Sequence, residues 1–187
     1  MLDMNDMRIG ALIVHDGAPH EVLEAHHMKM QQRRPVMQTR IRNLINGNVI
    51  PVTFQTHSII EPAEIERREI IFIYKGRGEY MFHEASDKSK RFGLNELVIG
   101  EKGKYLKLNA PVTAVVFNDQ IINIQMPIKI DLKVTEAPPD FKGDNATGGY
   151  KEVIVETGAK IKAPMFIKEG DVIKINTESG EYVERAK

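Results

Sequence analysis

Short runs of β-branched and aromatic residues alternate with polar positions along most of the chain. The clearest run is residues 128–134, Ile-Lys-Ile-Asp-Leu-Lys-Val, in which apolar and charged side chains alternate with a period of two. This period places the apolar set on one face of an extended strand. Further strands are predicted at residues 12–14, 70–74 and 112–117. The pattern therefore predicts a protein built mainly of β-strands.

Long segments with the 3.6-residue period of an amphipathic helix are missing. Only residues 5–10, 62–65 and 94–108 are compatible with a helical turn or a short helix. Turn signals are frequent, and each offers residues that tolerate a positive φ or bond their own backbone. They are Asp16-Gly17, Asn46-Gly47, Gly76-Arg77-Gly78, Asn118-Asp119 and Ser179-Gly180. We predict an all-β fold made of small barrels rather than one large sandwich.

Two interruptions of the strand pattern divide the chain. Ile60-Glu61-Pro62-Ala63 breaks the alternation, and Met126-Pro127 precedes a fresh alternating strand. Cutting at these points gives segments 1–64, 65–128 and 129–187, each about the size of a five- or six-stranded barrel. We therefore expect three domains.

Composition excludes several classes of site. The chain has no cysteine, which excludes disulfides, thiolate zinc sites, iron–sulfur clusters and cysteine nucleophiles. The first residues are acidic and are not followed by an apolar stretch, so no signal peptide is predicted. No apolar run approaches the roughly 20 residues that span a bilayer. We expect a cytoplasmic protein with no membrane association.

Charge is balanced over the whole chain but not locally. The 26 lysines and arginines equal the 26 aspartates and glutamates, which excludes a uniformly basic nucleic-acid surface. Residues 25–60, however, contain no acidic residue at all. The same window contains five cationic side chains, which are Lys29, Arg33, Arg34, Arg40 and Arg42.

This window also has the pattern of a β-hairpin. Residues 30–34 lie between two extended runs and are predicted to form the tip. In the strand after Pro35, the side chains of Gln38, Arg40 and Arg42 share one face. A basic hairpin suits contact with phosphate through charge and planar guanidinium groups. The alternative is a solvated edge hairpin whose cations prevent aggregation.

No motif for catalysis or cofactor binding is present. The chain lacks the G-x-S-x-G, H-E-x-x-H and P-loop patterns. His26 and His27 are adjacent on a predicted strand, so their rings point to opposite faces and cannot share a metal. Residues 143–149 are rich in glycine but are not flanked by the strand and helix of a nucleotide-binding loop. We therefore interpret them as a loop that contacts a partner or as a plain connector. We predict no catalytic residue, no metal and no cofactor. The alternative from a different functional class is an enzyme built on barrel scaffolds.

Several motifs together resemble the bacterial elongation factor P family. Residues 5–10 (Asn-Asp-Met-Arg-Ile-Gly), the hairpin 27–44 and Val52-Thr53-Phe54 are similar to its first domain. Residues 135–149 are similar to the opening of its third domain, and residues 166–171 to the segment near its close. Thr177, residues 179–183 and Arg185 continue this second match. The resemblance covers essentially the whole chain.

The resemblance implies an SH3-like barrel followed by two OB-fold barrels, in an L shape that mimics tRNA. It also implies a non-enzymatic, monomeric translation elongation factor whose partners are ribosomal RNA and the peptidyl tRNA. Such a factor binds between the peptidyl and exit tRNA sites and promotes peptide-bond formation at polyproline stalls by positioning the peptidyl tRNA. The implied tip residues, facing the tRNA acceptor end, are Lys29, Met30, Gln31, Gln32, Arg33 and Arg34. The implied RNA-binding residues are Arg8, Arg40, Arg42, Asp144, Asn145, Thr147, Gly148, Gly149, Tyr182 and Arg185.

The tip departs from the family pattern. The family's tip reads Pro-Gly-Lys-Gly, and its lysine, or an arginine in some branches, often carries a covalent extension. An ungapped alignment places Met30-Gln31-Gln32-Arg33 there, so that Gln32 takes the position of the modified residue. A neutral amide can accept neither lysylation nor rhamnosylation, whereas a shift of one residue places Arg33 at the apex. The alternative function is that of a factor-P-like RNA-binding paralogue with an unmodified arginine tip that acts on other stalling motifs, although residues 143–149 follow the main family closely.

Overall fold

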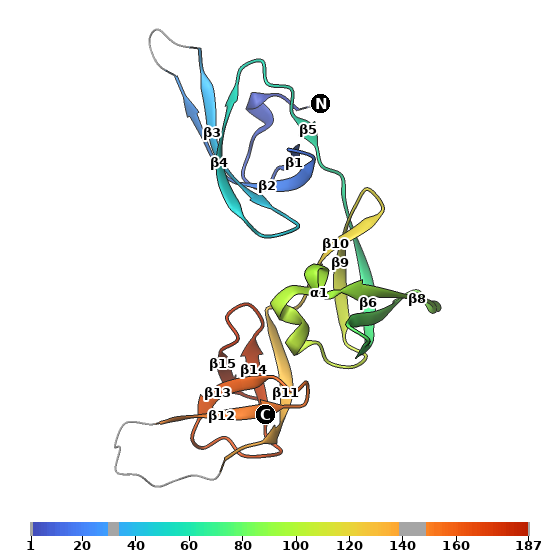
Figure 1. The fold of residues 1–187 in the computed structure, drawn as a ribbon. Coiled ribbons are helices and arrows are strands. Elements are labelled where there is room, and N and C mark those ends of the chain that lie inside the picture. Colours follow the sequence, from blue (N-terminus) through green and yellow to red (C-terminus); the bar gives the residue numbers. More distant parts are fainter. Residues whose placement is uncertain (1, 30–33, 139–148, 187) are drawn as a thin grey trace. The chain divides into compact units, whose positions relative to one another are not determined.

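The described residues of the chain fold into three five-stranded β-sheets with very little helix (Figure 1). The computed structural model describes residues 2–29, 34–138 and 149–186. The described residues pack into two compact units, the first made of residues 1–68 with 114–124 and the second of 69–113 with 125–187. The all-β prediction is confirmed.

The first sheet contains the N-terminal strands in the order β4-β3-β2-β1-β5, and its paired strands run antiparallel. A single 3-10 turn, η1 (Met4–Asp6), precedes them. The strands are β1 (Leu12–His15), β2 (Ala18–Met28), β3 (Val36–Asn43), β4 (Val49–Gln55) and β5 (Glu61–Pro62). Its core is formed by Met4, Met7, Ile13, Val22, Met37, Ile41, Phe54 and Ile60.

The middle sheet has the order β10-β9-β6-β7-β8. Its strands are β6 (Ile65–Gly76), β7 (Glu79–Glu84), β8 (Asp87–Asn95), β9 (Pro111–Phe117) and β10 (Gln120–Gln125). Between β8 and β9 lie the helices α1 (Glu96–Ile99) and η2 (Gly100–Tyr105). Asn95 caps α1, because its side-chain oxygen accepts a hydrogen bond from the Val98 amide at 3.1 Å.

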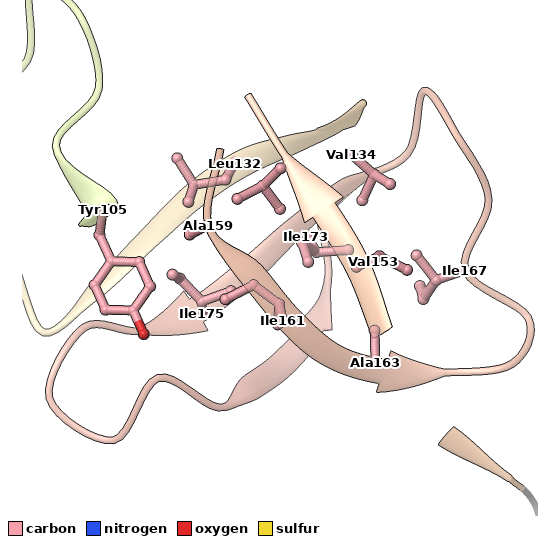
Figure 2. Packing of buried hydrophobic residues seen from close by; sticks show 11 residues of the cluster. Tyr105, Leu132, Val134, Val153, Ala159, Ile161, Ala163, Ile167, Ile173 and Ile175 are labelled. Carbon is pink, nitrogen blue, oxygen red and sulfur yellow. The ribbon is translucent and has the colours of Figure 1, made fainter. Parts of the chain in front are cut away.

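The third sheet has the order β13-β12-β11-β14-β15, again with antiparallel pairs. Its strands are β11 (Lys129–Glu136), β12 (Tyr150–Val155), β13 (Lys160–Pro164), β14 (Val172–Asn176) and β15 (Tyr182–Arg185). Figure 2 shows its core, in which Leu132 and Val134 point inward from β11 as the alternation predicts. Tyr105 from η2 belongs to the same cluster.

The predicted helical segments have mixed outcomes. Residues 94–108 contain α1 and η2, as predicted, and η1 supplies one turn at the start of residues 5–10. The helical reading of residues 62–65 is wrong. There Pro62 pairs with Ile13 of β1 and the Ala63 amide donates to the Leu12 carbonyl at 3.0 Å, so strand pairing determines this segment.

The predicted turns are confirmed by backbone conformation. Each of them contains a residue with φ between 49° and 83°, and the β1–β2 turn illustrates this with Asp16 at 49° and Gly17 at 74°. The breaks between the sheets fall at residues 62–65 and 125–129, next to the predicted cuts. The three-domain division itself stays a prediction.

Glu156 connects the third sheet to the segment that precedes β9. One of its carboxylate oxygens accepts a hydrogen bond from the Lys133 amide at 3.0 Å and lies 2.9 Å from the Lys107 ammonium. Burial raises the pKa of this carboxyl, but these hydrogen bonds and the two lysine charges outweigh burial, so the net pKa lies below the usual 4.5.

Replacing Glu156 with glutamine should therefore lower the free energy of unfolding at neutral pH by about 1 kcal/mol. A carboxyl with a depressed pKa in the folded state contributes stability above its unfolded pKa and loses it as the pH falls through the folded value. The difference between the two proteins should accordingly shrink below pH 4.5. Urea titrations across this pH range measure it, and a constant difference would contradict the assigned role of the charge.

Candidate RNA-binding hairpin

Strands β2 and β3 form the predicted hairpin (Figure 1). They pair from His20↔Asn43 to Met28↔Val36, with a register shift between Val22 and Glu24. Four of the six predicted tip residues, Met30, Gln31, Gln32 and Arg33, lie outside the described residues. The other two, Lys29 and Arg34, are exposed; Lys29 directly follows β2 and Arg34 lies two residues before β3.

The two faces of β3 differ as predicted. Met37, Thr39 and Ile41 are buried, whereas the side chains between them are exposed. Thr39 is satisfied inside, because its hydroxyl donates to the Val52 carbonyl at 2.9 Å. The exposed set is Gln38, Arg40 and Arg42.

Arg40 and Arg42 are not free cations, although their own strand has no acidic residue. Arg42 pairs with Glu21 at 2.5 Å, and Arg40 pairs with Glu24 at 3.1 Å. Both glutamates lie on β2, directly opposite the arginines in the strand register. We call these four residues the charge ladder. Although residues 25–60 contain no acidic residue, carboxylates from the preceding part of β2 therefore lie beside two of their arginines.

The charge ladder is exposed, which makes it weak. The arginine side chains are 56% and 47% exposed at positions 40 and 42. Exposed pairs of this kind contribute about 0.2–1 kcal/mol. Each bond uses one terminal nitrogen of a guanidinium group that carries five N–H donors. Both arginines can therefore share or exchange their carboxylate for another anion.

The cations nearest the tip differ from the ladder. In the described part of the chain, Lys29 and Arg34 make no ion pair, so positive charge that no carboxylate offsets is concentrated beside residues 30–33. Arg8 is also exposed, in the turn that precedes Gly10, whose amide donates to the Val22 carbonyl at 2.8 Å. His26 and His27 face opposite sides, since their cross-strand partners are Gln38 and Met37.

The candidate residues of the third sheet are only partly described. Asp144, Asn145, Thr147 and Gly148 lie outside the described residues, and Gly149 is exposed just before β12. Tyr182 is half-buried and packs against the core, so part of its side chain has a structural role. Arg185 is exposed, with a terminal nitrogen 4.0 Å from the Asp171 carboxylate.

Within the second unit, a hollow of about 870 Å³ offers no obvious anion site. Its three lysines are each paired with a glutamate: Lys75 with Glu96, Lys104 with Glu101 and Lys107 with Glu156. The described residues also contain no group of three histidine, aspartate or glutamate side chains placed to hold a metal. Nor does any helix among them have the length and apolar character needed to cross a membrane.

Two solved structures share the fold of about two thirds of this chain. A structure of "Eukaryotic translation initiation factor 5A from Methanococcus jannaschii" has a TM-score of 0.51 and 13% identity, over 66% of this chain and 89% of that one. A translation initiation factor eif-5a family protein from Naegleria fowleri has a TM-score of 0.52 and 12% identity, over 67% and 96%. At these identities the likeness defines the fold.

Sequence comparison defines the family. Residues 3–58 match the elongation factor P KOW-like domain, and residues 130–185 match the elongation factor P C-terminal domain. Proteins named elongation factor P from Moorella thermoacetica and Symbiobacterium thermophilum are 37% and 36% identical over 186 residues, which is 100% of each chain. One from Microcystis aeruginosa is 35% identical over 185 residues. This chain belongs to the elongation factor P family.

Membership confirms the resemblance of the sequence motifs and makes the protein a translation elongation factor that interacts with the ribosome. Factors of this kind are generally not enzymes. The sequence predicted the hairpin and its outward arginines but missed Glu21 and Glu24. In a hairpin, residues at equal distances in sequence from the tip lie near each other on the two strands. Counting in this way from residues 30–34 places Glu24 and Glu21 near Arg40 and Arg42, so the sequence alone could have predicted these ion pairs.

Proposed function

We propose that this protein binds the ribosome between the peptidyl and exit tRNA sites, as a monomer in the cytoplasm. There it contacts the peptidyl tRNA and promotes peptide-bond formation at consecutive prolines. The observation that carries the proposal is the match to the elongation factor P family along the whole chain. Lys29 and Arg34 beside the hairpin tip support it, because both are exposed and make no ion pair with any residue that the structure describes, and RNA phosphates attract such cations.

The proposed mechanism is positioning rather than chemistry. Proline is a poor nucleophile, and its ring fixes φ, which restricts its approach to the peptidyl ester. Holding the acceptor end of the peptidyl tRNA in a reactive orientation removes part of the entropic barrier. The ribosome then carries out its own peptidyl transfer, and the factor supplies no reacting group.

Each candidate residue receives a role in this proposal. The tip, residues 29–34, faces the acceptor end of the tRNA. The guanidinium groups of Arg8, Arg40 and Arg42 bind backbone phosphates. The remaining candidates contact RNA from the third sheet and from the residues between β11 and β12, and they are Asp144, Asn145, Thr147, Gly148, Gly149, Tyr182 and Arg185.

A reconstituted translation system tests the proposal directly. Adding the purified protein should accelerate synthesis of a peptide with three consecutive prolines, and should leave a matched peptide with alanines at those positions unchanged. Chemical probing of the ribosomal RNA should show protection between the peptidyl and exit sites. Equal rates on the proline template with and without the protein would refute the proposed activity.

The paralogue function has one observation in its favour. Gln32 replaces the residue that relatives modify, while Arg33 and Arg34 follow it immediately. The same translation system separates the two functions when templates with other stalling sequences are included. Acceleration confined to those templates would favour the paralogue.

A further inference from the structure

Exposed aromatic side chains gather at one end of the third sheet. Among the described residues only three tyrosine or phenylalanine side chains are largely exposed, and two of them, Tyr150 and Phe166, lie here, 61% and 57% exposed. Tyr150 opens β12 and is paired with Pro164, the last residue of β13. Phe166 follows Pro164 by two residues. Neither ring belongs to the hydrophobic core of the third sheet, to which Val153, Ile161 and Ala163 contribute.

A lysine lies over the Tyr150 ring. The Lys162 ammonium is 5.5 Å from the ring centroid. In the strand register Lys162 faces Glu152, but the Glu152 carboxylate is 3.0 Å from the ammonium of Lys160 instead. Within the described part of the chain, Lys162 therefore has no carboxylate partner. The result is an aromatic face next to a positive charge that no carboxylate offsets.

We propose that Tyr150 and Lys162, here called the aromatic platform, bind single-stranded RNA. An unpaired base stacks on the Tyr150 ring while the adjacent backbone phosphate contacts Lys162. Bases of every type can stack on an aromatic ring, and a lysine beside the ring can bind the phosphate backbone of the RNA. Phe166 provides a second ring at the same end of the sheet.

Charge favours RNA over an apolar partner. On the outward face Tyr150 is paired with Pro164, and the next outward pair along the strands, Glu152 and Lys162, is charged, so the ring is bordered by a cation that an RNA phosphate can contact. The inference rests on the proposed function, because the ribosome is the source of the RNA. It adds a contact outside the tip and outside residues 143–149.

Binding of a fluorescently labelled ten-uridine strand to the full chain, followed by anisotropy, tests this site. Tyr150→Ala should weaken binding by at least about fivefold, the lower end expected for one stacked base. Tyr150→Phe should retain wild-type affinity because it keeps the ring. Lys162→Gln should reduce the salt slope by about 0.7. Tyr74→Ala is the matched control, since Tyr74 is 50% exposed on the middle sheet, and it should change nothing.

Several outcomes would overturn the inference. They are unchanged affinity of Tyr150→Ala, an equal loss in Tyr74→Ala, or equal binding of a ten-base-pair duplex. Thermal melting checks folding, and Lys162→Gln decides the question if Tyr150→Ala does not fold. Ribosome pelleting distinguishes the two proposals: wild-type protein that fails to bind ribosomes contradicts the proposed function, whereas normal ribosome binding with an unaffected Tyr150→Ala contradicts only the platform.

Discussion

Replacing both Arg40 and Arg42 with glutamine should weaken ribosome binding on the order of tenfold at moderate salt. It should also lower the slope of log affinity against log salt concentration by about two, because each lost phosphate contact removes about one unit. Glutamine is preferred to glutamate here, since Arg42→Glu would place a carboxylate directly opposite Glu21 and disturb the sheet itself. Ribosome co-sedimentation across a salt series measures both quantities.

The glutamates of the charge ladder provide a control in which ribosome affinity should change in the opposite direction. Glu21→Gln with Glu24→Gln removes the carboxylates that compete with phosphate, so affinity should rise by up to about fivefold. This gain should disappear when Arg40 and Arg42 are also glutamine. Lys90→Gln removes a comparably exposed ion pair with Glu84, at 3.3 Å on the middle sheet, and should have no effect. An unchanged salt slope in the double arginine variant would reject the phosphate contacts.

Local patterns predicted best the strands that have one buried and one exposed face, such as β3 and β11. In β11 the alternation of the sequence reappears as buried Leu132 and Val134 between exposed polar or charged residues. The error at residues 62–65 has the opposite cause. There Pro62 is a strand residue because β1 lies beside it, and a partner about fifty residues earlier leaves no trace in the local pattern.

The site was predicted less completely, since its chemistry depends on neighbours across strands. The acid-free window correctly indicated a basic hairpin, but it counted Arg40 and Arg42 as free. Their partners Glu21 and Glu24 lie outside the window and reach them only through the β2–β3 register. Likewise, only the register reveals that Glu152 pairs with Lys160 and leaves Lys162 over the Tyr150 ring. The period of the sequence predicts which face of a strand a side chain occupies, but the net charge around that side chain depends on which residues the strand register places opposite it.

The hairpin tip should work without modification, with arginine side chains taking the part of the modified lysine of relatives. Gln32 has no amine or guanidinium group for the known modifications, whereas Arg33 and Arg34 carry ten N–H donors between them. Guanidinium groups bind phosphate in a bidentate way without any added extension. Of these three residues the structure describes Arg34, which is exposed and has no ion-pair partner among the described residues.

Arg33→Ala should therefore impair synthesis across consecutive prolines more than Gln32→Ala does, and recombinant protein should be as active as protein from the native host. The absence of both family glycines at the tip supports this, because fewer conformations have to be lost when the loop binds. Rates on a triple-proline template compare the variants, and intact-mass measurement of host-derived protein checks for modification. A mass shift on the peptide spanning Lys29–Arg34, or a larger loss in Gln32→Ala than in Arg33→Ala, would show that Gln32 or an added group is the functional apex instead.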